Sequence, residues 1–158
     1  MAWRDEWYQP TPVRKAALRA EIEDGRPVGL LAYRAGTSVG WVAVSARVDR
    51  PRLERSRRYG PEPGDEDVFA ITCCYVPPEH RGSGVASTLL DAAIEYAREV
   101  GATAVDAFPK VESPPHTKDS RRAEENDSWM GRRSSYQVRG FKAIREPGKR
   151  VVMRRRLR

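Results

Sequence analysis

The sequence predicts an α/β fold in which a central sheet is flanked by helices. Residues 68–76 form a nearly continuous apolar and β-favouring run, VFAITCCYV, as expected for a strand that is covered on both faces. Residues 85–100 repeat apolar side chains at three- and four-residue steps, which is typical of an amphipathic helix. A buried strand followed by such a helix, with further β-favouring runs on both sides, indicates a mixed α/β domain.

A helix and a β-hairpin are predicted before the central strand. Thr11 followed by proline is typical of a helix start, so a helix with Thr11 as its N-cap is expected over residues 12–24. Two β-favouring runs, residues 29–34 and 39–45, are joined by a short glycine-containing turn and therefore predict a hairpin. Trp41 is expected to anchor this hairpin in the core.

The remaining segments complete a predicted order of α-β-β-β-α-β-α-β-β within one domain. They are a surface connection over 47–66, a strand over 102–108, a long mobile loop over 109–128, a short helix over 129–139 and a last hairpin over 141–157. The single domain is expected to cover residues 1–158, because a chain of this length buries enough surface for one core.

Composition narrows the classes of function. No apolar run approaches the roughly 20 residues that cross a bilayer, so a soluble, cytoplasmic protein is expected. The adjacent Cys73 and Cys74 cannot join distant segments and suit a reducing compartment. His80 and His116 have no carboxylate or thiolate at ligand spacing, so no metal is expected. The net charge of +7 suits a nucleic acid or a polyphosphate cofactor equally well.

The segment between the central strand and the amphipathic helix, PPEHRGSGVA at residues 77–86, contains two glycines directly before the predicted helix start. Gly82 and Gly84 free backbone N–H groups, remove side chains that would block close approach, and lie at the positive end of the helix dipole. This arrangement indicates a site for an anion such as a pyrophosphate. Ser87 replaces the third glycine of a dinucleotide fingerprint, and the Walker A lysine is absent, so both nucleotide folds are disfavoured.

The same segment resembles the coenzyme A pyrophosphate loop of GNAT N-acetyltransferases, (Gln/Arg)-x-x-Gly-x-(Gly/Ala), which Arg81, Gly84 and Ala86 match. The Tyr-x-x-x-Gly-Phe pattern that begins at Tyr136 is also similar to that family. The resemblance covers about residues 28–157. It implies a mixed, mostly antiparallel central sheet flanked by helices, and an enzyme that transfers an acetyl group from acetyl-CoA to an amine. The sequence departs from the family pattern in its short N-terminal part, since only about ten residues precede Thr11.

Carried over position by position, the resemblance implies a set of cofactor-binding residues. Backbone amides of the loop would hold the pyrophosphate of acetyl-CoA. The exposed backbone at the end of the central strand would pair with the pantetheine arm, and one of its amides would stabilise the reaction's oxyanion. The residues are Cys74, Tyr75, Val76, Arg81, Gly82, Ser83, Gly84, Val85, Ala86 and Ser87.

The resemblance also implies that Tyr136 is the general acid that protonates the departing CoA thiolate. Some relatives carry a glutamate base on the central strand, but this sequence has Ala70 there. Asp67 and Asp106 are the nearest candidates for the base, and the alternatives are Glu112, a water chain or no dedicated base.

The sequence does not identify the acceptor, which is expected to be a small-molecule or protein amine. The loop over 109–128 is expected to close over the amine side, and a homodimer is compatible with the resemblance. Two other functions stay open. One is a catalytically silent CoA-binding regulatory module, which Ala70 favours. The other is a basic nucleic-acid-binding protein, which is disfavoured because the arginines are scattered and no binding motif is present.

Overall fold

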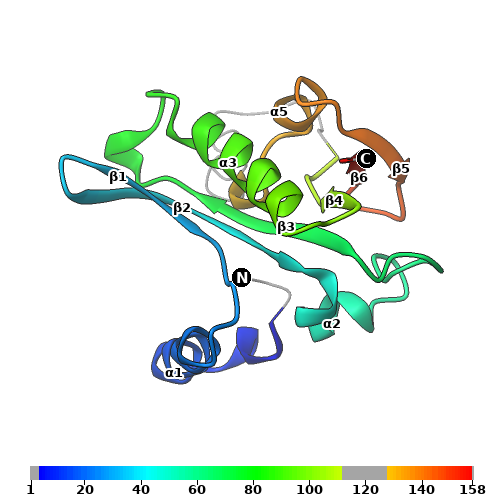
Figure 1. Cartoon of the computed structure of the whole chain (residues 1–158), viewed down its shortest axis with the longest axis horizontal. Coiled ribbons are helices and arrows are strands. Elements are labelled where there is room, and N and C mark those ends of the chain that lie inside the picture. The colour runs from blue at the N-terminus through cyan, green and yellow to red at the C-terminus, as the bar shows by residue number, and fades with distance from the viewer. Residues whose placement is uncertain (1–3, 112–127, 158) are drawn as a thin grey trace.

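The computed structural model describes residues 4–111 and 128–157 (Figure 1). Its helices and strands are α1 Thr11–Glu23, β1 Leu30–Arg34, β2 Thr37–Ala46, α2 Pro51–Glu54, β3 Val68–Tyr75, α3 Val85–Glu99, β4 Ala104–Ala107, α5 Arg133–Gln137, β5 Lys142–Arg145 and β6 Val152–Arg156. Four short 3-10 turns accompany them: η1 Asp5–Tyr8, η2 Arg47–Asp49, η3 Pro78–His80 and η4 Ser128–Met130.

The six strands form one sheet in the order β1-β2-β3-β4-β6-β5. Every neighbouring pair is antiparallel except β3 and β4, which are parallel. Helix α3 covers one face of the sheet, and α1 and α2 lie on the other side (Figure 1). The predicted fold class and the predicted order of elements are confirmed, with α2 as the one helix that was not predicted.

The main core lies between α3 and the sheet. The apolar face of α3 is buried at Leu89, Leu90, Ala93, Ile94 and Ala97, and it packs against buried side chains of β2 and β3. Burying one such leucine or isoleucine side chain contributes about 1.5–3 kcal/mol, so this face holds the helix in place. The helix ends at Glu99 with Val100 as its C-cap, and the next residue, Gly101, has a φ of 87°, the left-handed conformation that is common just after a helix end.

A second, smaller core lies near α2, and it corrects the predicted surface connection over 47–66. Leu53 of α2 is fully buried there with Ala70, Phe108, Met130 and Val152, and Tyr59 and Trp129 pack against them. Arg47 and Arg50 in the same segment are also buried. An arginine-rich stretch reads as surface in the sequence, but here two guanidinium groups have buried partners.

The β1–β2 hairpin forms as predicted, with one correction. Ala35 and Gly36 both have positive φ, 48° and 79°, which is the two-residue turn that matches the twist of paired strands. Trp41 is only half-buried, so its prediction as a core anchor is wrong. It lies opposite Leu31 and Tyr75, which are 51% and 47% exposed, on the face of the sheet that α3 does not cover.

Helix α1 confirms the predicted helix, but the predicted cap is wrong. Thr11 is the first helical residue rather than the N-cap, which is Pro10, and no residue of α1 is buried. The predicted loop over 109–128 falls almost wholly outside the described residues. No helix in residues 4–111 or 128–157 has the length and apolar character needed to cross a membrane.

Candidate functional site

Strands β3 and β4 run side by side for only part of their length. Their parallel pairing joins Val68–Ile71 to Ala104–Ala107, whereas β3 continues through Thr72–Tyr75 paired only with β2. The chain after β4 instead follows β6, through a bridge between Lys110 and Arg150. Within the described residues, the backbone of Thr72–Tyr75 therefore has no strand partner on its β4 side.

A β-bulge lies at the point where the two strands separate. Ala43 of β2 faces Cys73, but the next residue, Val44, faces Ile71, so Thr72 is an extra residue on β3. A bulge bends its strand and increases the local twist, which accounts for the separation from β4 directly after Ile71. Sequence reasoning missed the bulge because the run over 68–76 is apolar throughout and shows no break in alternation.

The glycine loop has the geometry of an anion site. Gly82 and Gly84 have φ values of 73° and 82°, and a Cβ added to either would meet no atom within 4 Å, so the space above them is open. Gly84 is the N-cap of α3 and provides no side chain to cap it. The backbone N–H groups of Val85, Ala86 and Ser87 therefore point out of the helix start, at the positive end of its dipole.

Two side chains brace this loop from within. The Arg81 Nε donates a hydrogen bond to the carbonyl of Val76 at 3.0 Å, and the Ser83 hydroxyl donates to the carbonyl of His80 at 2.6 Å. The Arg81 side chain thus ties the loop to the residue that follows β3. Arg81 is exposed, so the rest of its guanidinium faces outward beside the loop.

Arg139 joins α5 to the start of α3, and sequence reasoning missed it. Its guanidinium donates to the carbonyl and the hydroxyl of Ser87 and to the carboxylate of Asp91, with 2.7 Å between Nε and Oδ1 of Asp91. It also donates to the carbonyl of Ser135 at 2.7 Å. Because the Ser87 oxygen accepts from Arg139, its own hydroxyl proton is left to donate to an incoming anion. The signal available in the sequence was an arginine three residues after Tyr136.

The side chain of Tyr136 lies in the core rather than at the surface of the site. Its side chain is fully buried, and its hydroxyl donates a hydrogen bond to the carbonyl of Met130 at 2.9 Å. The ring packs edge-on against Phe141, with 5.2 Å between the ring centroids. Burial raises the pKa of Tyr136 well above that of a free phenol, and the neighbouring Cys74 adds to this shift.

The two cysteines and Tyr75 contribute backbone rather than side chains to the open edge of β3. Cys74 packs in the core under α3, and burial raises the pKa of its thiol to about 12, so it stays protonated and unreactive at neutral pH. Burial also raises the pKa of Cys73. The side chain of Tyr75 is about half exposed on the other face of the sheet.

Asp106, one of the two predicted candidates for the base, is held in a buried ion-pair network. Its carboxylate is fully buried and pairs with Arg47 and with Arg154, with 2.6 Å between Arg154 Nε and Oδ1 of Asp106. Arg154 also pairs with both carboxylate oxygens of Asp65, at 2.6 and 2.8 Å. Both oxygens of Asp106 accept from guanidinium N–H groups, so the carboxylate is not free to take a proton from an amine.

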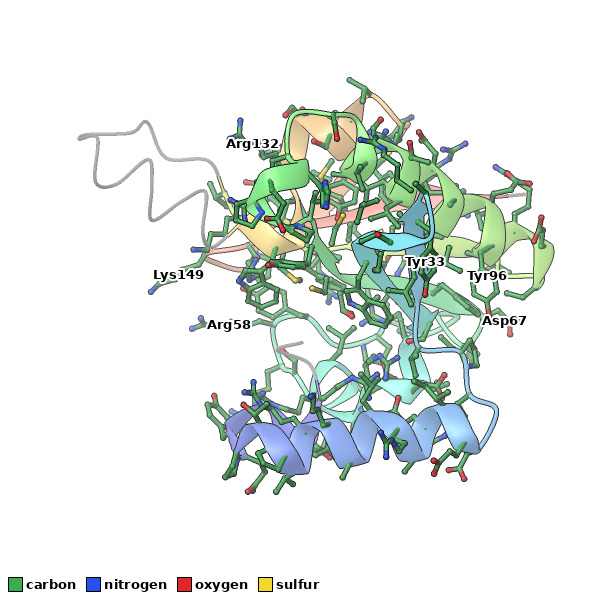
Figure 2. All side chains as sticks on the ribbon, turned by 90° about the vertical axis from the view of Figure 1, so that its left-hand side faces the viewer. Tyr33, Arg58, Asp67, Tyr96, Arg132 and Lys149 are labelled. Carbon is green, nitrogen blue, oxygen red and sulfur yellow. The ribbon has the colours of Figure 1, made fainter. Side chains whose placement is uncertain are left out.

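Asp67 is exposed at the start of β3, at the far end of the strand from the glycine loop. Nine residues separate it from Val76, which is roughly 30 Å of strand. Figure 2 shows Asp67 beside Tyr96 of α3, on the opposite side of the view from Arg132, which precedes α5. Neither Asp67 nor Asp106 therefore lies at the open edge of β3.

The described residues also bear on metal chemistry. In residues 4–111 and 128–157, no three His, Cys, Asp or Glu side chains come together in a way that could hold a metal ion.

The candidate site is thus a sheet that opens between two parallel strands, beside an uncapped helix start. The chain belongs to the acetyltransferase (GNAT) family, whose sequence model matches residues 1–130. Tyr136 lies beyond this matched segment. A search of the curated proteins gives no significant match.

Solved structures share the fold at low sequence identity. A ribosomal-protein-alanine N-acetyltransferase from Brucella melitensis has a TM-score of 0.58 and 20% identity over 94% of this chain and 79% of its own. The Salmonella typhimurium protein yncA, with acetyl-CoA, has a TM-score of 0.58 and 19% identity over 94% and 75%. The Escherichia coli protein YhbS, with CoA, has a TM-score of 0.57 and 19% identity over 90% and 66%.

Proposed function

We propose that the protein transfers the acetyl group of acetyl-CoA to an amine by direct attack within a ternary complex. Membership of the GNAT family supports acetyl transfer. The observation that carries the cofactor assignment is the start of α3, where two left-handed glycines leave three backbone N–H groups uncapped in open space. Such a helix start favours a phosphate by both its hydrogen-bond donors and its dipole.

The open edge of β3 continues from this loop and suits the pantetheine arm. Acetyl-CoA supplies the thioester, and the protein's part is to orient it. The unpaired N–H and C=O groups of Thr72–Tyr75 can hydrogen-bond the amides of the arm as a neighbouring strand would. An N–H group near the bulge at Thr72 is positioned by the fold rather than by a flexible side chain, so it can donate to the thioester oxygen with little reorganisation.

We propose that Tyr136 assists the departing thiolate through a hydrogen bond rather than by full proton transfer. A CoA thiol has a pKa near that of cysteine, about 8.5, and the pKa of Tyr136 is raised above about 10, so complete transfer of its proton is uphill. The hydroxyl must also leave the Met130 carbonyl before it can reach a ligand. Its contribution is therefore at the low end of general acid catalysis, about a hundredfold or less.

We propose that no side chain among the sequence candidates acts as a dedicated base. Asp106 is committed to two guanidinium groups and Asp67 lies at the wrong end of β3. The acceptor then loses its proton to water before it attacks, so the rate should rise with pH up to the pKa of the amine itself. Asp67→Asn should leave kcat/KM within about twofold of the wild type, and a larger loss would restore Asp67 as the base.

The cofactor site is tested by thermal unfolding with and without CoA. A ligand that binds only the folded state adds about 2.7 kcal/mol at a hundredfold excess over Kd, which is an easily measured rise in Tm. Gly84→Glu puts a carboxylate where the phosphates would lie and should abolish this rise. Gly64→Glu is the matched control, because Gly64 also has positive φ, 91°, and open space around it. An equal CoA shift in both variants would reject the loop assignment.

Tyr136→Phe tests the proposed hydroxyl role. We expect turnover to fall about tenfold with CoA affinity unchanged. We also expect a loss of about 1–3 kcal/mol in the free energy of unfolding, because the Met130 carbonyl loses its buried donor. A stability loss with full turnover would make Tyr136 a packing residue only.

Ala70 favours a second candidate, a CoA-binding module without catalysis. It is fully buried and contributes no carboxylate at the strand position where a base is expected. A panel of primary amines separates the two functions. CoA binding without acetylation of any amine would support the silent module, and turnover of one amine would exclude it.

A further inference from the structure

Three charged side chains from distant segments meet on the side of the sheet away from α3. Glu21 of α1 pairs with Arg4 through one carboxylate oxygen and with Arg50 through the other, at 3.3 Å between Arg50 Nη1 and Oε2. Arg4 is 8% exposed and Arg50 is 1% exposed. The group therefore joins the N-terminal segment, α1 and the chain before α2 (Figure 1).

The charges in this group do not balance. Two buried guanidinium groups share one carboxylate, and the Nη2 atoms of both Arg4 and Arg50 are buried without a hydrogen-bond partner. Burial lowers the pKa of Arg50, and the charge of Arg4 lowers it further. Asp49 acts on Arg50 only through its charge and through its backbone carbonyl, which accepts from Nη1 at 2.9 Å. Buried cations without partners are costly, so such groups need an explanation.

We propose that Arg4, Arg50 and Glu21 form a binding site for a small anionic group, a carboxylate or a phosphate. An anion would supply the missing negative charge and would accept hydrogen bonds from the two free Nη2 groups. The planar guanidinium fork suits both of these anions. Glu21 holds the two arginines in place, and the charge of Asp49 also acts on Arg50, but neither carboxylate accepts a hydrogen bond from the two Nη2 groups.

The anion has two possible sources, the acceptor itself or a free anion in solution. On the proposed function, CoA approaches from the start of α3, so the acceptor has the other face of the sheet, where α1 and α2 lie. The anionic group can then belong to the acceptor, as in an amino acid or an amine phosphate. It can also be a free anion that binds independently of catalysis.

Binding is tested first, without reference to acetyl transfer. Inorganic phosphate is added to the protein in saturating CoA, which occupies the glycine loop, and Tm is measured. We expect a rise of roughly 5–10 °C at a hundredfold excess over Kd. The rise should be lost in Arg50→Gln and in Arg4→Gln but kept in Arg19→Gln, which removes an exposed arginine from α1. No rise in the wild type, or an equal rise in Arg50→Gln, overturns the site.

A conservative variant keeps the test decisive if Arg50→Gln does not fold. Arg50→Lys retains the charge but loses the fork, so it should bind phosphate about tenfold more weakly than the wild type. Wild-type affinity in Arg50→Lys would mean that phosphate binds elsewhere, and the site would be rejected.

Matched amines then distinguish the two sources. Tyrosine is compared with tyramine, and O-phosphoethanolamine with ethanolamine, because each pair differs only in the anionic group. If the anion belongs to the acceptor, kcat/KM should favour the anionic member by about tenfold or more, and Arg50→Gln should remove the preference. Phosphate binding without any such preference assigns the site to a free anion. If no amine is acetylated but phosphate still binds, the proposed function fails and the site stands.

Discussion

Two buried arginine clusters occupy the same side of the sheet and differ in their charge balance. In one, Arg47 and Arg154 pair with three carboxylates, those of Glu54, Asp65 and Asp106, so both cations are compensated. In the other, Arg4 and Arg50 share Glu21 alone. Both join segments that are distant in the sequence, and both contain buried guanidinium groups, Arg47 in the first and Arg4 and Arg50 in the second.

The difference separates a structural role from a binding role. In the balanced cluster, Arg154 donates to both oxygens of Asp65 and of Asp106, and hydrogen bonds with Asp106 raise the pKa of Arg154. The Nε of Arg47 has no hydrogen-bond partner, but it lies 3.5 Å from the Glu54 carboxylate, so every cation of this cluster faces an acid. The cluster joins the chain before β3 to β4 and β6. The unbalanced cluster keeps two unused donors, which is the state expected of a site that awaits a ligand.

The largest loss of stability is expected for a substitution in the balanced cluster. Asp106→Asn removes the carboxylate that Arg47 and Arg154 share and leaves the fully buried Arg47 with only the partly exposed Glu54, 3.5 Å away. Removing one partner of a buried ion pair costs about 3–5 kcal/mol, and we expect this loss in the free energy of unfolding measured with urea. A loss below about 1 kcal/mol would mean that the cluster does not hold the fold together.

In the unbalanced cluster, removal of the carboxylate should strengthen the binding of phosphate. Glu21→Gln removes the carboxylate that pairs with both Arg4 and Arg50, so phosphate should bind several-fold more tightly than in the wild type. The same variant should be less stable without phosphate, because the two cations then lose their shared partner. Calorimetric titration measures the affinity, and weaker phosphate binding in Glu21→Gln would contradict the assignment.

Acid should weaken the balanced cluster. Burial alone would raise the pKa of Asp65, but hydrogen bonds from Arg154 and from the backbone of Glu62 outweigh it, and the pKa is lowered overall. A lowered pKa adds stability above the unfolded value of about 3.9, and this stability is lost as the pH falls below about 4. Unfolding of Asp65→Asn should depend less on pH in this range, and an unchanged pH dependence would contradict the network.

The smallest loss of stability is expected for an ion pair that is exposed to solvent. Arg26 and Asp24 form an ion pair whose side chains are 50% and 65% exposed. Arg26→Gln should change the free energy of unfolding by about 0.5 kcal/mol or less, because water screens an exposed pair. A loss comparable to that of Asp106→Asn would show that burial does not explain the difference between the clusters.

Much of the fold was predictable from the sequence because its strongest patterns are local. The apolar run at 68–76 and the helical period at 85–100 place β3 and α3 almost to the residue. The glycine loop was also predictable, since the residues needed for positive φ stand directly before the helix. These features depend on neighbours a few positions away, which a sequence shows directly.

Apart from the cap of α1, the misses depend on distant partners. Arg47 looks like a surface residue until Asp106, 59 positions later, provides a buried carboxylate. The same pairing removes Asp106 from the candidate bases. The bulge at Thr72 depends on the register with β2, and the exposure of Trp41 depends on which face of the hairpin is covered. No local pattern carries this information.

The short β3–β4 ladder also divides the sheet into two units that can open separately. The halves β1-β2-β3 and β4-β6-β5 share only the four residue pairs from Val68↔Ala104 to Ile71↔Ala107. Helix α3 packs mostly on the first half. Amide hydrogen exchange should therefore show two protection levels, with slow exchange in β2 and β3 and faster exchange in β5 and β6. Slippage at this seam would change the width of the opening while each half stays folded.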